Sequence, residues 1–117
     1  MPYWKISQNY HFMGDDDKAI PFLESAFYRG QSVKNPKEIM WAEQYYVKKE
    51  NYSKIIFIDK LLLDQSPDQK ESVRLHVNLA VAYAKLGQKD KAIEYAKKVE
   101  KIDPSQKEMV AAFLRAL

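Results

Sequence analysis

Few side chains in this 117-residue sequence could do chemistry, and their spacing does not form a catalytic or metal site. Asp15, Asp16 and Asp17 form a run of carboxylates, but consecutive side chains diverge, and the run lacks the alternating spacing and glycine of a calcium loop. Such a run suits the positive end of a helix that begins beside it. His11 and His76 are too far apart to argue for a pair; His76 falls at a packing position, whereas His11 is a candidate ligand contact.

The sequence contains no grouping of Ser, His and acid, no Gly-rich phosphate loop and no metal-ligand spacing, so we predict neither an enzyme nor a cofactor or metal. It has no cysteine, which excludes disulfides and leaves the compartment undetermined. Lys and Arg exceed Asp and Glu by 19 to 16 and are mixed with them, which argues against nucleic acid as a partner. The most apolar stretch, 55–63, is shorter than the ~20 residues that span a bilayer, so we expect no membrane insertion.

Helix start signals and apolar residues at spacings of three and four predict an all-α fold. Asn35-Pro36-Lys37-Glu38 and Ser66-Pro67-Asp68-Gln69 each combine a cap with proline at the first helical position, and Ser105 with Glu108 forms a capping box. An N-cap at Asp16 or Asp17 would place Pro21 near a helix start, where its missing donor costs little. The predicted helices cover about 2–13, 16–29, 36–50, 52–65, 67–86, 89–102 and 105–117.

The sequence contains three copies of one internal repeat. The aligned sets are Tyr10, Gly14, Ala19 and Ala26; Tyr46, Ile55, Leu62 and Pro67; and Tyr83, Gly87, Ala92, Val99 and Pro104. The segment VRLHVNLAVAYAKLGQKDKAIEYAKKVEKIDP, residues 73–104, resembles the tetratricopeptide repeat (TPR), with Leu79-Ala80, Tyr83, Gly87, Ala92 and Pro104 at the family's positions. The first unit fits nearly as well. The resemblance implies one domain over 1–117, an alpha-alpha superhelix of three TPR helix hairpins, about 1–30, 36–66 and 67–104, plus a C-terminal capping helix, 105–117.

Small residues such as Ser7, Ala19 and Ala92 would let paired helices approach, while the three repeated tyrosines fill the wedge between them. The middle unit departs from this pattern: it has Glu43 and Ile55 in place of small residues and Glu50 in place of glycine. An extra turn beginning at Ser66 predicts an unusually long first helix for the third unit.

The two ends of the chain differ. The stripe of Met109, Phe113 and Leu117, with Val110 and Leu114, predicts a lid over the last hairpin. No matching lid precedes Tyr3 and Trp4, so we expect a segment upstream of Met1 to be missing. The tail, IDPSQKEMVAAFLRAL, is also similar to that of some bacterial polytopic membrane proteins of the O-antigen ligase type.

The resemblance to the tetratricopeptide repeat implies a scaffold that binds a protein or peptide in a concave groove lined by the first helix of each hairpin. The groove positions are Trp4, Gln8, His11, Phe12, Lys37, Met40, Gln44, Val47, Lys48, Arg74, Val77, Val81, Ala84 and Lys85. This surface would be apolar in the middle and basic at one rim, which suits an amphipathic helix or an extended peptide with acidic flanks. Lys5 and Asn9 fall one position off the groove, which argues against a carboxylate clamp.

Two alternatives remain open at this point. Trp4, Phe12 and Met40 could instead pack against one another as core residues, as stripes at helical spacing commonly do. The chain could also be a structural repeat fragment of a larger protein, or form a homodimer through its uncapped first hairpin, where Tyr3, Trp4, Phe12 and Phe22 gather.

Overall fold

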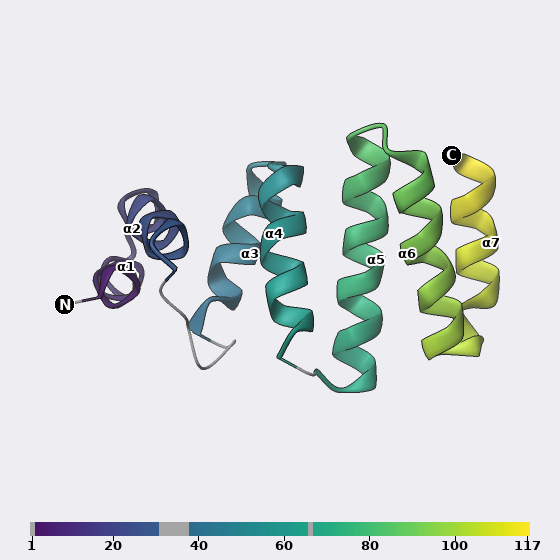
Figure 1. Ribbon diagram of the computed structural model, residues 1–117, viewed down its shortest axis with the longest axis horizontal. Coiled ribbons are helices and arrows are strands. Elements are labelled where there is room, and N and C mark those ends of the chain that lie inside the picture. Colours follow the sequence, from purple (N-terminus) through teal and green to yellow (C-terminus); the bar gives the residue numbers. More distant parts are fainter. Residues whose placement is uncertain (1, 31–37, 66) are drawn as a thin grey trace. The chain divides into compact units, whose positions relative to one another are not determined.

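The computed structural model describes residues 2–30, 38–65 and 67–117, and the regular structure in these ranges is entirely helical (Figure 1). The elements are α1 (Tyr3–Phe12), α2 (Asp16–Tyr28), α3 (Met40–Lys48), α4 (Tyr52–Leu63), α5 (Gln69–Lys85), α6 (Lys89–Ile102), the 3-10 helix η2 (Pro104–Gln106) and α7 (Lys107–Ala116). The predicted all-α class is therefore confirmed. The chain divides into two compact units, 1–45 and 46–117. Within the described residues, no helix combines the length and apolarity needed to cross a membrane.

The first unit is built on the hairpin of α1 and α2, and small residues bring these helices together. Ser7 is fully buried, and its hydroxyl donates to the carbonyl oxygen of Ala19 at 2.6 Å. Ala19 and Ala26 are also fully buried, so at these two positions α2 places only a methyl group in the interior. Beside them, the rings of Tyr10 and Phe22 stack with centroids 5.5 Å apart. The small residues and the tyrosine therefore take the packing places that the repeat predicts.

Two predicted helix starts in the first unit need correction. The N-cap of α2 is Asp15, whose side chain accepts the Lys18 N–H at 3.2 Å, and not Asp16 or Asp17. Asp15 directly follows the left-handed Gly14, so the turn itself fixes it as the cap. The helix predicted from residue 36 begins at Met40, because Glu38 lies in a 3-10 turn whose carbonyl accepts the Trp41 indole N–H at 2.7 Å. The predicted cap at 35–37 lies outside the described residues.

Two starts in the second unit also differ from prediction. Asp68 caps α5 by accepting the Glu71 N–H at 2.8 Å; Ser66 lies outside the described residues. The capping box predicted from Ser105 does not form, because Asp103 accepts both the backbone N–H of Ser105 at 3.1 Å and its hydroxyl at 2.7 Å. These bonds stabilise the carboxylate and lower the pKa of Asp103. They produce the turn η2, so α7 begins at Lys107.

The turns after α1, α3 and α5 share one backbone hydrogen-bond pattern. The carbonyl oxygen of each repeated tyrosine accepts an N–H from five residues further on, as in a Schellman motif. The pairs are Tyr10 with Asp15 at 2.9 Å, Tyr46 with Asn51 at 3.0 Å and Tyr83 with Gln88 at 2.9 Å. The residue before each donor is left-handed: Gly14 (φ 81°), Glu50 (φ 53°) and Gly87 (φ 77°). The middle turn thus closes like the others although its sequence lacks the glycine.

Glu50 is an exposed side chain in a backbone conformation that favours glycine. We expect Glu50→Gly to raise the free energy of unfolding by about 0.5–1 kcal/mol, because relief of the left-handed strain exceeds the added flexibility of the unfolded chain. Urea denaturation followed by circular dichroism measures this change. Glu108→Gly, at an exposed helical position in α7, should instead destabilise by about 0.5–1 kcal/mol. A loss of stability in Glu50→Gly would contradict this reading of the turn.

The second unit packs α4, α5, α6 and α7 around two apolar clusters. Leu79, Tyr83 and Ala92 form one cluster, against which side chains of α4 and α7 pack. Ala80, Ala96, Val99 and Val110 form the other, with Phe113 and Leu114 packed against it. Val110 is 2% exposed, so α7 covers the last hairpin, as the predicted capping helix should. With 17 residues, α5 is the longest helix in the described part of the chain, in line with the expected extra length.

Candidate partner-binding groove

An apolar groove of about 370 Å³ opens between α5 and α7, and α6 forms its floor. Figure 1 shows these three helices side by side, with α6 in the middle. The lining consists of Val77, Ala80 and Val81 from α5, Ala96 and Val99 from α6, and Met109, Val110, Ala112 and Phe113 from α7. The alanines leave the space, since a larger side chain at any of them would project into it. The groove follows from small residues on all three helices.

The two sides of the groove leave apolar side chains in water. Val81 is 39% exposed on α5, and Met109 is 41% exposed on α7. Every residue that lines the groove is apolar. Apolar concavities with exposed sides are typical of surfaces that bind apolar groups of a partner. This site can therefore take up apolar side chains, but its lining offers no group for acid–base chemistry.

The charges predicted at the basic rim of α5 are only partly available. Arg74 forms an ion pair with Glu71 one turn earlier in the same helix, so a neighbouring carboxylate offsets its charge. Lys85 lies at the last residue of α5 and is exposed. Arg115, in the last turn of α7, is exposed as well. Lys85 and Arg115 therefore place positive charge at the C-terminal ends of these two helices.

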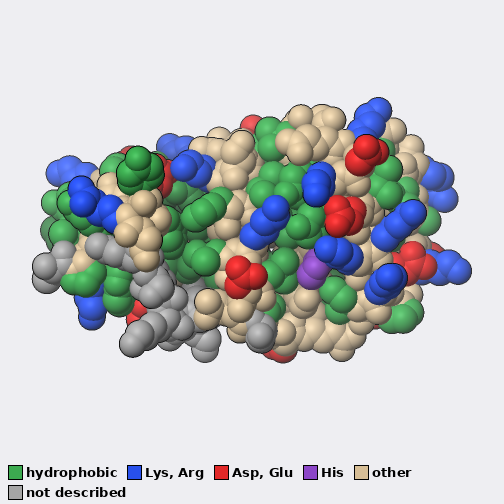
Figure 2. Space-filling model, in the orientation of Figure 1, with side chains coloured by type: hydrophobic (Ala, Val, Ile, Leu, Met, Phe, Trp, Pro, Cys, Tyr) green, Lys and Arg blue, Asp and Glu red, His purple; other side chains and the backbone are tan. Residues whose placement is uncertain are grey.

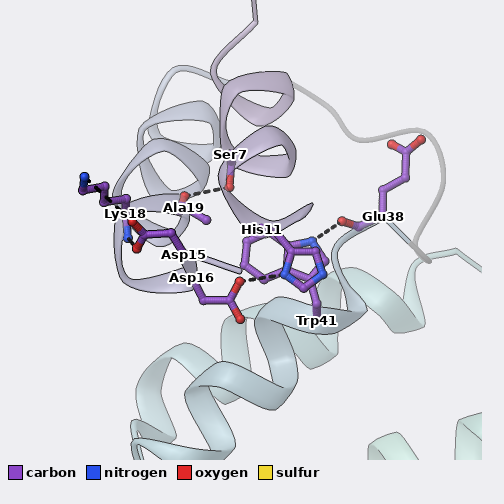
Figure 3. A network of polar contacts seen from close by, with 8 residues as sticks. All are labelled: Ser7, His11, Asp15, Asp16, Lys18, Ala19, Glu38 and Trp41. Atoms are coloured by element: carbon purple, nitrogen blue, oxygen red, sulfur yellow. Dashed lines mark hydrogen bonds and ion pairs between the residues drawn. The ribbon is translucent and has the colours of Figure 1, made fainter. Parts of the chain in front are cut away.

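The predicted site residues of α1 have different surroundings, and Figure 3 shows those of His11. Trp4, Gln8 and His11 are half-buried, whereas Phe12 is 77% exposed. His11 Nδ1 lies 2.7 Å from Asp16 Oδ1, and its ring stacks on Trp41 with centroids 4.3 Å apart. The contacts of His11 are therefore made within the protein, between α1, α2 and the start of α3. It acts there as a packing and hydrogen-bonding residue.

The three consecutive aspartates diverge toward three different partners. Asp15 caps α2, Asp16 contacts His11, and Asp17 accepts the Tyr45 hydroxyl at 2.8 Å. That hydrogen bond raises the pKa of Tyr45, because the phenol must give up its proton to ionise. In the ranges that the structure describes, no three His, Cys, Asp or Glu side chains come together as a metal site would require.

The remaining predicted positions lie on α3, except Lys37, which is outside the described residues. Met40 is half-buried, Gln44 and Lys48 are exposed, and Val47 is 43% exposed. Of the predicted set, Val77 and Val81 are the two residues that line the groove between α5 and α7.

The contribution of α7 was missed by sequence reasoning. The stripe that contains Met109, Val110 and Phe113 predicts only a lid, yet these residues form a wall of the groove together with Ala112. A signal for this role was present. Because α7 follows α6 as the first helix of a further hairpin would, its exposed stripe at spacings of three and four continues the groove-lining pattern of α5.

Comparison with known proteins identifies the class of this chain. Residues 2–29 and residues 73–106 each match the tetratricopeptide repeat, and together these segments cover more than half of the chain. The chain therefore belongs to the tetratricopeptide repeat family, whose members generally mediate protein–protein interactions.

A plant relative extends the similarity through the middle repeat, about 36–66. "Protein CTR9 homolog" from Arabidopsis thaliana is 28% identical over an alignment of 106 residues, and the match covers 87% of this chain and 9% of that protein. The chain thus spans a small part of the length of this relative. No solved structure matches the present chain significantly.

Proposed function

We propose that the unit formed by residues 46–117 binds an apolar segment of a partner polypeptide in the groove between α5 and α7. The observation that carries this proposal is a continuous apolar lining that leaves Val81 and Met109 exposed at its sides. Membership of a family of protein-binding, typically non-catalytic repeats supports it. The chain would then act as an interaction scaffold without catalysis.

The dimensions and charges of the groove suggest the form of the ligand. A volume of about 370 Å³ accommodates a few apolar side chains rather than a folded domain. An amphipathic helix presents such side chains at spacings of three and four, and an extended peptide presents them at every second residue. Lys85 and Arg115 lie at the C-terminal ends of the two walls, where acidic residues flanking the apolar ones would be favoured.

A selection followed by a matched pair of variants tests this proposal. Peptides that bind the chain are selected from a random dodecamer library displayed on phage, and their affinities are measured by fluorescence anisotropy. Val81→Glu should weaken the selected peptides by about tenfold or more, because it places a charge among apolar groups. Leu86→Glu is the control: Leu86 is the C-cap of α5 and is 41% exposed, but outside the groove.

The outcomes of this test are distinct. The helix content of both variants should equal that of the parent in far-ultraviolet circular dichroism, because both positions are exposed. Equal affinity of the parent and Val81→Glu would contradict the proposal, as would equal losses in the two variants.

The predicted contacts on α1 and α3 extend the same proposal. Gln8, Gln44 and Lys48 would contribute polar contacts in the hairpins that contain them. The single domain over 1–117 and the relation of the tail to O-antigen ligase-type proteins remain predictions as well.

Self-association is a second candidate function, favoured by exposed aromatic and apolar side chains in the first unit. Phe12 is 77% exposed, Met13 76% and Tyr28 93%. Sedimentation at several protein concentrations distinguishes the two functions. A monomer at all concentrations removes the homodimer, whereas association that Phe12→Ser abolishes would support it.

A further inference from the structure

The exposed Lys60 of α4 and Lys98 of α6 lie over two tyrosine rings, the buried Tyr83 of α5 and the half-buried Tyr95 of α6. These four residues are here called the Lys–Tyr patch. The rings of Tyr83 and Tyr95 stack with centroids 5.4 Å apart. Lys60 Nζ lies 5.6 Å from the centroid of Tyr83, and Lys98 Nζ lies 4.7 Å from that of Tyr95. Each ring thus holds one ammonium group and contacts the other ring.

The Lys–Tyr patch is separate from the groove. Val81 and Tyr83 are two positions apart on α5, which places them about 200° apart around the helix axis. Val81 faces α7 across the groove, whereas Tyr83 meets Lys60 of α4 and Tyr95 of α6. The inference drawn from the patch therefore does not depend on the proposed groove function.

The rings fix the lysine ammonium groups in advance of binding. A free lysine side chain has many conformations, and ordering it opposes binding. Contact with an aromatic ring removes part of this freedom and favours the charged form. A hydrogen bond with Tyr83 is the main cause that raises the pKa of Lys60. Lys60 and Lys98 are both exposed and so remain accessible to a partner.

The surroundings of the patch are positively charged on balance. Glu94 lies 3.7 Å from both Lys91 and Lys98, so a carboxylate already sits between two ammonium groups there. With Lys60 included, three exposed lysines face one glutamate. Figure 2 shows that Lys and Arg side chains predominate over Asp and Glu side chains where α5 and α6 face the viewer. This surface therefore complements additional carboxylates.

We propose that the Lys–Tyr patch docks an acidic segment of a polypeptide, whose carboxylates bind Lys60 and Lys98. Single-stranded nucleic acid fits less well, because each tyrosine ring is already in contact with a lysine and the other ring, and bases need open aromatic faces to stack. Three lysines around one glutamate also form a short site compared with the rows of phosphate contacts that nucleic acid requires.

The probe for this proposal is a fluorescein-labelled decaglutamate peptide, titrated with the full chain at low ionic strength. We expect saturable binding that weakens as salt is added. Lys60→Gln with Lys98→Gln should weaken binding by about tenfold. Lys70→Gln with Lys107→Gln removes the same charge from exposed positions of α5 and α7, and should change the affinity by less than about threefold.

A third pair of variants tests the role of the rings. Tyr95→Leu keeps both lysines but removes the ring beneath Lys98, and should weaken decaglutamate binding by about threefold. Tyr95→Phe keeps the ring and should retain the affinity of the parent. Far-ultraviolet circular dichroism establishes that each variant is folded. The proposal is overturned if decaglutamate does not bind, or if the two lysine pairs lose affinity equally. Tighter binding of a thymidine decamer, or of phosphatidylserine vesicles, would also overturn it.

Discussion

Replacing Leu79 with alanine is expected to lower the free energy of unfolding by about 3 kcal/mol. Leu79 is fully buried and belongs to the cluster that joins α5 to α6. Side chains of α4 and α7 and the C-terminal residue pack against this cluster: Ile56, Leu63, Phe113 and Leu117. The substitution removes buried apolar contacts and leaves a cavity that four packed helices cannot readily close.

Urea denaturation followed by circular dichroism at 222 nm measures this loss. Leu86→Ala makes the same chemical change at a side chain that is 41% exposed, and should cost less than about 1 kcal/mol. A cost for Leu79→Ala no greater than that for Leu86→Ala would show that the cluster is not the core of the second unit.

Ser7→Leu should destabilise the first unit by about 2–4 kcal/mol, through overpacking and the loss of a hydrogen bond. Ser7 is fully buried, and its hydroxyl lies 2.6 Å from the Ala19 carbonyl oxygen. A leucine side chain is larger than that of serine, and it would lie at a point where Ala19 also has no exposed surface. The two helices would have to separate to admit it.

Tryptophan fluorescence suits this measurement, because Trp4 and Trp41 both lie within residues 1–45. Ser7→Ala serves as the control, since it removes the hydroxyl without adding volume and should cost about 1 kcal/mol. If Ser7→Leu is no more destabilising than Ser7→Ala, then close approach of α1 and α2 is not what this position requires.

The helices and the repeat could be predicted because the tyrosines and small residues act through local geometry. Tyr10 and Tyr83 lie four residues before glycines, and that spacing alone predicts a hairpin turn. The middle turn was harder to predict, because Glu50 adopts a left-handed conformation that its residue type does not favour. Glu43 and Ile55 are nevertheless buried, so these two positions of the middle repeat remain packing positions although their side chains are larger.

The errors lie at helix starts, where several side chains compete for the same N–H groups. Asp103 accepts the Ser105 N–H that Glu108 would accept in the predicted capping box, and Asp15 caps α2 in place of its two acidic neighbours. These choices depend on the preceding turn, which a local capping pattern does not include.

Of the two walls of the candidate groove, the sequence could predict the one on α5 but not the one on α7. Val77 and Val81 follow from the repeat register, but the role of α7 depends on how its lid packs over α6. The Lys–Tyr patch could not be predicted, because Lys60, Tyr83 and Tyr95 come from three helices and meet only in the folded unit. His11 was a candidate ligand contact for the same reason: its partner Trp41 is distant in sequence.

Methyl-resolved nuclear magnetic resonance, with a selected peptide titrated into the full chain, tests most directly the claim that the groove binds a partner. If the groove binds the peptide, the largest shift changes should fall on the methyl groups of Val77, Val81 and Met109, which line the groove. Methyl groups of Ile56 and Leu63, which pack on the other cluster, should change little. Changes confined to those two residues, with unchanged signals from the groove, would contradict it.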